Sequence, residues 1–198
     1  MSRIAELPQE NWDAQLREHF DPGNASPLEI KARGIMAHAP HMANANTAFM
    51  ASAFGGHQLS RRLIELVRLR IAFHNQCRSC MAMRFQSALD DGVTEDLVCS
   101  LERPAEAPDL TDREKAALDY ADVFATNHFA VNDETFARLR VHFSESEIVE
   151  LGVFTAYFTG YGRWLAVLDL VEELPKDLQD KSIKAAPWQT RGSVVVQG

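Results

Sequence analysis

The chain has 198 residues, 46% of them hydrophobic, which is enough for one packed domain or for a domain with appendages. Its formal net charge of −8 at pH 7 argues against nucleic-acid partners and anionic membrane surfaces, because binding to either needs basic patches. No apolar run reaches the roughly 18 residues of a membrane span. The first residues lack the apolar core of a signal peptide, so we expect a cytoplasmic protein.

Helix start signals recur along the chain and predict an all-α, multi-helix bundle with essentially no sheet. Ser26 before Pro27 is typical of a helix N-terminus. Thr111 with Glu114 has the spacing of a capping box. No strand pattern stands out before residue 190. The expected helices cover 27–38, 60–74, 77–90, 94–100, 111–126, 133–142 and 144–171, with a small-residue segment at 41–53 and a loop at Gly55–Gly56.

The predicted helices form a single domain over residues 1–174, because Pro175 ends the amphipathic part of the chain. Residues 175–198 are polar and finish in a short apolar stretch. We expect this segment to be either a disordered tail or an arm that docks on a partner subunit.

A pair of cysteines, Cys77 and Cys80, carries the main chemical signal. Residues at i and i+3 of a helix are neighbours on one face, at a separation that a disulfide can bridge. At a helix N-terminus, unpaired N–H groups and the helix dipole favour the reactive thiolate. Arg84, seven residues after Cys77, is expected on the same helical face and adds positive charge. A redox dithiol is therefore the leading hypothesis.

Two other interpretations of the cysteine pair stay open at this point. Both residues could be small apolar core residues, since cysteine is often buried without any reactive role. They could also hold a metal together with His74, but a structural zinc site needs four ligands and no second such motif is present. Cys99 has the pattern of a core residue.

Glu65 and His74 are the remaining candidates near the cysteines. Glu65 lies in an apolar helix, where burial would raise the pKa of its carboxyl group and suit it to proton transfer. Its spacing to Arg61 and Arg68 nevertheless favours a plain surface ion pair. His74 could relay protons because histidine titrates near neutral pH, although a histidine at this position more often caps a helix end.

The segment that holds Glu65 and Cys77-x-x-Cys80 resembles the alkyl hydroperoxidase D-like proteins of the carboxymuconolactone decarboxylase superfamily. The resemblance covers about 60–170 and is carried by residues 63–80, 110–127 and 143–167. It implies an all-α fold and a homo-oligomer (a trimer or a hexamer). We expect no cofactor and no metal. The resemblance also implies reduction of a peroxide or a disulfide at the expense of an unidentified thiol reductant.

The resemblance assigns a role to each site residue. Cys80 would attack the peroxide, Cys77 would resolve the product as a disulfide, and Glu65 would belong to a proton relay. The family has a histidine four residues after its second cysteine, and here that position is Arg84, which cannot act as a base. His74 is an auxiliary candidate for that role, and Arg84→His is expected to raise peroxide turnover.

These observations lead to three hypotheses. The first is a peroxidase-like oxidoreductase with antioxidant activity that works through Cys77 and Cys80. The second is a non-catalytic or redox-sensing helical oligomer in which Arg84 marks a lost peroxidase relay. The third is a decarboxylase or lyase that acts on a small metabolite between helices.

Overall fold

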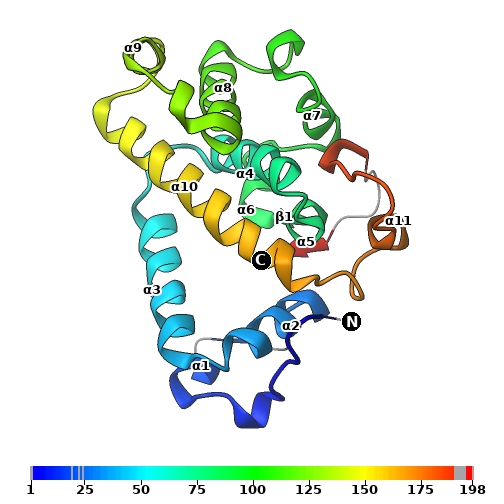
Figure 1. Cartoon of the computed structure of the whole chain (residues 1–198). Coiled ribbons are helices and arrows are strands. Elements are labelled where there is room, and N and C mark those ends of the chain that lie inside the picture. Colours follow the sequence, from blue (N-terminus) through cyan, green and yellow to red (C-terminus); the bar gives the residue numbers. More distant parts are fainter. Residues whose placement is uncertain (1, 19, 22, 24, 190–194, 198) are drawn as a thin grey trace.

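Helices make up nearly all of the regular structure in the computed structural model, which describes residues 2–18, 20–21, 23, 25–189 and 195–197. Among these residues there are eleven α-helices and two three-residue strands, so the predicted all-α fold is confirmed (Figure 1). No helix in the described part of the chain combines the length and the apolar character that crossing a bilayer requires.

Two long helices cross at the centre of the molecule: α4 (Arg61–Asn75) and α10 (Glu145–Leu168), with α8 (Asp112–Asn127) packed against α4 (Figure 1). Ser60 caps α4, and a capping box begins each of α8 and α10. Leu66, Leu69 and Ile71 of α4 are fully buried in the main core. Gly162 of α10 lets the end of α4 approach closely, since a Cβ atom there would lie 2.8 Å from Asn75 Nδ2.

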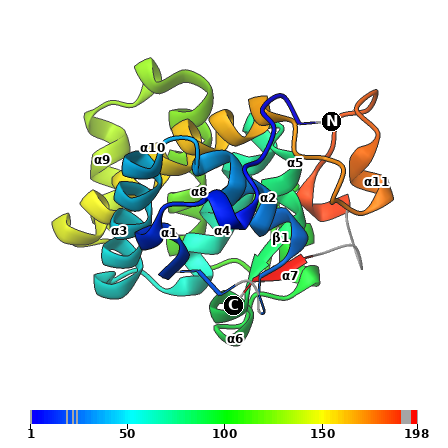
Figure 2. The same ribbon diagram turned by 90° about the horizontal axis from the view of Figure 1, so that it is seen from below.

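The N-terminal helices form an arm beside α10. This arm consists of α1 (Ala14–Glu18), α2 (Pro27–Met36) and α3 (Pro40–Gly56), with a small apolar core of its own. Figure 2 shows α3 on one side of the molecule and α11 (Lys176–Gln179) on the other, with α2 between them. Gly55 and Gly56 form the last residues of α3, so the loop expected there is wrong; nothing lies within 4 Å of where their Cβ atoms would be.

The predicted helix over 77–90 is wrong in its middle. It is divided into α5 (Arg78–Ala82), the strand β1 (Met83–Phe85) and α6 (Gln86–Asp90). β1 pairs in parallel with β2 (Val195–Gln197), so a strand also exists before residue 190. The extended backbone at Met83 lets its carbonyl accept hydrogen bonds from two arginines instead of continuing the helix.

The remaining elements are short. They are α7 (Glu95–Ser100), α9 (Asp133–Arg140) and four 3₁₀ helices at Gln9–Asn11, Pro104–Glu106, His128–Ala130 and Pro187–Gln189. Residues 176–189 pack on the chain itself: Leu178 is buried, and the Trp188 ring lies 4.6 Å from the Phe73 ring. The division of the chain at Pro175 stays a prediction, and residues 190–194 and 198 of the predicted tail lie outside the described residues.

The N-terminus of α8 is held to α4 by an ion pair between Glu114 and Arg62. Burial alone would raise the pKa of Glu114, but hydrogen bonds from Arg62 and Thr111 outweigh it and lower that pKa. The pair therefore stabilises the fold above the ordinary glutamate pKa, and this contribution is lost as the pH falls through the lowered value. We expect Glu114→Gln to reduce the free energy of unfolding by about 2 kcal/mol at pH 7, and by less near pH 3, in urea titrations.

Candidate functional site

The two cysteines lie at the junction between α4 and α5. Gln76, with φ of 50°, ends α4 in the left-handed region, and Cys77 then caps α5. The Cys77 sulfur accepts a hydrogen bond from the Cys80 N–H at 3.3 Å and lies 3.4 Å from the Ser79 hydroxyl. A disulfide joins Cys77 to Cys80, whose Cα atoms are 5.2 Å apart. The chain turn therefore brings the two sulfur atoms together at one helix N-terminus.

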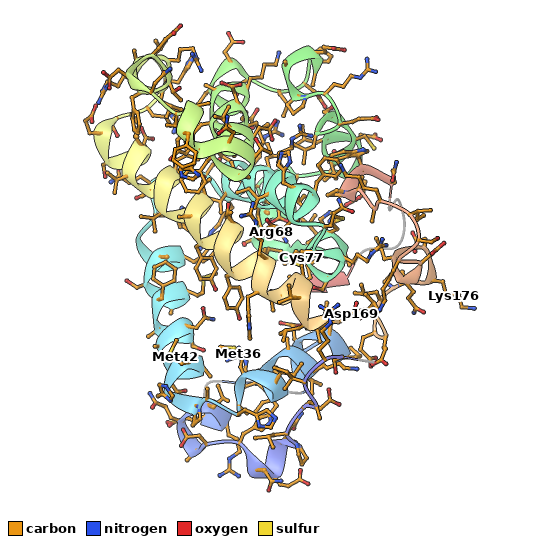
Figure 3. All side chains as sticks on the ribbon, viewed as in Figure 1. Met36, Met42, Arg68, Cys77, Asp169 and Lys176 are labelled. Carbon is orange, nitrogen blue, oxygen red and sulfur yellow. A yellow bond between two sulfur atoms is a disulfide. The ribbon has the colours of Figure 1, made fainter. Side chains whose placement is uncertain are left out.

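The two sulfurs differ in access. The side chain of Cys77 is 0% exposed, whereas Cys80 is 7% exposed and lines a chamber of about 100 Å³. This chamber shares Met50, Met83 and Tyr161 with a larger cleft of about 400 Å³ between α2, α3 and α10. Figure 3 labels Arg68 and Cys77 in the middle of the molecule, and Met36 of α2, which lines the larger cleft. A small molecule in the cleft would therefore reach Cys80 before Cys77.

Glu65 and Arg68 form a buried ion pair beside the cysteines. Glu65 is 2% exposed, and both of its oxygens accept hydrogen bonds of 2.7 Å from Arg68. Arg68 also donates to the carbonyl oxygens of Cys80 at 2.7 Å and Met83 at 2.8 Å. The sequence therefore identified one partner of Glu65 correctly, but the pair is buried instead of exposed. Arg61 donates to the Phe54 carbonyl.

His74 pairs with Asp122 of α8 and not with the cysteines. Its Nε2 atom lies 2.7 Å from Asp122 Oδ1 of α8, which also accepts a hydrogen bond from Arg70. Burial alone would raise the pKa of Asp122, but these two hydrogen bonds outweigh it and lower that pKa. In the described part of the chain no hydrogen bond joins His74 to a cysteine, and no group of three or more His, Cys, Asp and Glu side chains is placed to hold a metal.

Arg84 does not share a helical face with the cysteines, because α5 ends at Ala82. Its side chain is 0% exposed. The guanidinium pairs with Glu95 at 2.9 Å and donates to the carbonyl oxygens of Met81 at 2.7 Å and Met83 at 2.9 Å. These contacts hold the extended segment after α5 against the start of α7. Arg84 is therefore placed to fix the backbone near the site.

The gain in turnover expected from Arg84→His no longer follows from this geometry. Histidine is too short to replace these contacts. The change would remove the side-chain donor of Glu95 and of the Met81 carbonyl oxygen, and it would leave the Met83 carbonyl oxygen with Arg68 alone. We expect Arg84→His to lower the free energy of unfolding by about 3 kcal/mol in urea titrations. The exposed Arg103→His is the matched control and should change it by less than about 0.5 kcal/mol. Equal stability of the two variants would contradict this role.

Sequence reasoning missed Arg68 and the tyrosines of α10 as parts of the site. Tyr157 and Tyr161 line the chamber with Cys80, and their rings are stacked at 5.0 Å. The i, i+4 spacing of the two tyrosines on one apolar helix places them on the same helical face, but this pattern also fits ordinary core packing. The i+3 spacing of Arg68 from Glu65 indicated that the two side chains could pair, but not that Arg68 lines the chamber.

Comparisons with known proteins match this arrangement. Residues 40–123, which include Glu65, Arg68 and both cysteines, match the model of the carboxymuconolactone decarboxylase family. Over these residues the chain is similar to the carboxymuconolactone decarboxylase family, and AhpD-like proteins are among the solved structures that it resembles. Two curated proteins have similar sequences. Rv2313c of Mycobacterium tuberculosis strain H37Rv is 39% identical over 116 residues, and YdfG of Bacillus subtilis strain 168 is 27% identical over 106 residues. Both are uncharacterized.

These alignments cover parts of the proteins. The match to Rv2313c takes in 54% of this chain and 40% of the relative, and the match to YdfG takes in 53% of this chain and 72% of the relative. The chain therefore spans less than half of the length of Rv2313c.

Solved structures of the superfamily share the fold. The AhpD core of an uncharacterized peroxidase-related protein from Ralstonia eutropha JMP134 has a TM-score of 0.71 at 19% identity, over 90% of this chain and 94% of that one. ATU0492 from Agrobacterium tumefaciens, of unknown function and described as a candidate antioxidant defence protein AhpD, has a TM-score of 0.58 at 25% identity, over 67% and 91%. The similarity to the Ralstonia eutropha structure supports the fold alone, because the sequence identity is only 19%.

Proposed function

We propose that this protein is a thiol–disulfide oxidoreductase that reduces a hydroperoxide, or a small disulfide, through Cys80 and Cys77. The observation that carries the proposal is a cysteine pair that can close as a disulfide, of which one member, Cys80, lines a chamber next to a larger cleft. The match to the carboxymuconolactone decarboxylase family and the similarity to ATU0492, described as a candidate antioxidant defence protein AhpD, support the same reaction class.

In the first step the Cys80 thiolate attacks the terminal oxygen of the hydroperoxide. A sulfur–oxygen bond forms and the oxygen–oxygen bond breaks, so sulfur is oxidised to a sulfenic acid and the leaving alkoxide takes a proton to become an alcohol. In the second step Cys77 attacks the sulfur of the sulfenic acid. The disulfide forms, and the departing hydroxide takes a proton to leave as water.

A thiol reductant closes the cycle. Two thiol groups of a donor reduce the Cys77–Cys80 bond and are themselves oxidised to a disulfide. The predicted cytoplasmic location would supply such donors, because that compartment keeps thiols reduced. The predicted homo-oligomer, a trimer or a hexamer, is part of the proposal, and exposed apolar residues such as Val149 and Val153 on α10 support a covered face there.

The Glu65–Arg68 pair supports the proposed chemistry in two ways. Arg68 lines the chamber with Cys80, and a guanidinium in a poorly solvated wall favours the thiolate. Glu65 holds that guanidinium with two hydrogen bonds. We also propose that Glu65 takes part in a proton relay. Its carboxylate is linked to the redox segment through Arg68, which binds both the carboxylate and the Cys80 carbonyl oxygen.

Steady-state assays with a dithiol donor test the function. With dithiothreitol and cumene hydroperoxide, we expect alcohol to form in a one-to-one ratio to the hydroperoxide consumed, at a rate well above that of dithiothreitol alone. If the disulfide opens and closes reversibly but hydroperoxide reduction is not accelerated, the proposed enzymatic activity is contradicted and the redox-sensing oligomer is favoured. Turnover that persists after both cysteines are replaced would favour the decarboxylase or lyase alternative.

A further inference from the structure

The cleft beside the cysteine chamber has the size and lining of a small-molecule site. Its volume of about 400 Å³ falls in the range of ligand pockets, which is roughly 300–1,000 Å³. Most of its wall is apolar and comes from α2, α3 and α10. The apolar lining includes Leu28, Ala32, Met36, Met50, Leu165 and Leu170.

One cation of this cleft, Arg33 of α2, lacks an ion pair in the described part of the chain. Its Nη1 atom donates to the neutral Thr47 hydroxyl at 3.1 Å, and its guanidinium lies 5.0 Å from the centre of the Phe20 ring. Arginine has five N–H donors, so most of its hydrogen-bonding capacity is unused by these contacts. Burial lowers the pKa of Arg33, with Tyr161 and Glu29 acting in the opposite direction, but an arginine stays charged at neutral pH.

A phenol lies beside this cation. Tyr161 of α10 lines the same cleft as Arg33. Burial raises the pKa of Tyr161, although the positive charge of Arg33 acts to lower it, so the hydroxyl stays protonated and can donate a hydrogen bond. A guanidinium and a phenol hydroxyl that face one apolar space are the donors that bind a carboxylate.

The single carboxylate of the cleft limits the charge of the ligand. Glu29 lines the same wall, one helical turn before Arg33, and its Oε2 atom accepts hydrogen bonds from the N–H and the hydroxyl of Ser26. It therefore belongs to the capping box of α2 and is no ion-pair partner of Arg33. A second negative charge on a ligand would be repelled by Glu29, so a monoanion suits the cleft better than a dianion.

The cleft and the chamber are neighbouring cavities. Tyr161, Met50, Met83 and Leu165 line both cavities, so a molecule held at Arg33 can extend past these side chains toward Cys80. We propose that the preferred substrate is an amphipathic hydroperoxide with one carboxylate, held by Arg33 and Tyr161 at its charged end. The apolar body packs along the methionines, and the peroxide reaches Cys80. This inference rests on the proposed function and names its substrate class.

A matched pair of substrates tests the anion site by kinetics. Cumene hydroperoxide and its para-carboxylated analogue have the same reacting group and differ by one carboxylate. We expect the carboxylated compound to have a KM about 10-fold lower, and we expect Arg33→Gln to remove this preference by raising the KM of the carboxylated compound. Arg33→Lys should retain part of the preference and Tyr161→Phe should reduce it. Arg17→Gln, the same charge change at an exposed residue of α1 outside the cleft, should leave it intact.

A binding measurement on the oxidised protein separates this inference from the proposed function. In calorimetric titrations, 4-isopropylbenzoate should bind at least about 10-fold more tightly than 4-isopropylbenzamide, and Arg33→Gln should abolish the difference while unfolding at the same urea concentration. Equal KM values for the two hydroperoxides, together with equal binding of acid and amide, would overturn the anion site even if peroxide reduction is intact. Arg33-dependent binding without turnover of either hydroperoxide would instead overturn the proposed function and leave the anion site standing.

Discussion

Replacing Cys80 by serine should abolish hydroperoxide turnover, with a fall in kcat/KM of roughly 1,000-fold or more. The reason is that the attacking sulfur is lost, and a serine hydroxyl is a far weaker nucleophile at neutral pH than a thiolate. Cys80 is the member of the pair that lines the chamber, and no other cysteine among the described residues lines it. The measurement is alcohol formation from cumene hydroperoxide with dithiothreitol as the donor.

The matched variant Cys77→Ser should fail at a later step. Cys80 is intact in that protein, so one equivalent of hydroperoxide should still add one oxygen atom at Cys80, and the sulfenic acid should persist because the resolving thiol is missing. Peptide mass analysis locates the added oxygen. Cys99→Ser is the control and should turn over normally, since Cys99 is on α7 and outside the disulfide. Reversed behaviour, with Cys80→Ser accumulating oxidised Cys77, would exchange the two proposed roles.

The second large effect is expected at Glu65. Glu65→Gln leaves the Arg68 guanidinium buried with only carbonyl oxygens as partners. Removing one member of a buried ion pair typically costs 3–5 kcal/mol because the remaining charge is uncompensated, so we expect a loss of about 3 kcal/mol in the free energy of unfolding. Urea titrations of the reduced and the oxidised protein measure it. Turnover should also fall, by at least about 10-fold in protein that is still folded.

A double variant separates the structural role of Glu65 from its chemical role. Glu65→Gln combined with Arg68→Met removes both charges, so most of the lost stability should return. Turnover should stay low in the double variant, because neither the carboxylate nor the guanidinium is present at the chamber. A folded Glu65→Gln protein with unchanged turnover would reduce Glu65 to an ion-pair residue without a part in the reaction.

The parts of the fold that the sequence predicted are those set by local signals. Ser26, Ser60, Thr111 and Ser144 each cap the helix that was expected to start there. Capping residues act on their own first turn, so they are readable without knowledge of the rest of the chain. The closeness of Cys77 and Cys80 was predictable for the same reason, since three residues separate them.

The errors come from contacts that are distant in sequence. The strand at Met83–Phe85 depends on pairing with Val195–Gln197, more than a hundred residues later, which no local pattern of residues 77–90 indicates. Because Arg84 lies in this strand, it does not share a helical face with the cysteines. The burial of the Glu65–Arg68 pair had the same kind of cause, because the two carbonyl oxygens that Arg68 binds come from the segment after α4.

The redox chemistry of the cysteine pair is tested most directly by a thiol count with intact mass on the reduced wild-type protein, before and after one equivalent of hydroperoxide. We expect a loss of two thiols and of two hydrogen atoms in mass, with the new bond mapped between Cys77 and Cys80 and with Cys99 still a thiol. Full retention of all three thiols, or oxidation confined to Cys99, would contradict this chemistry.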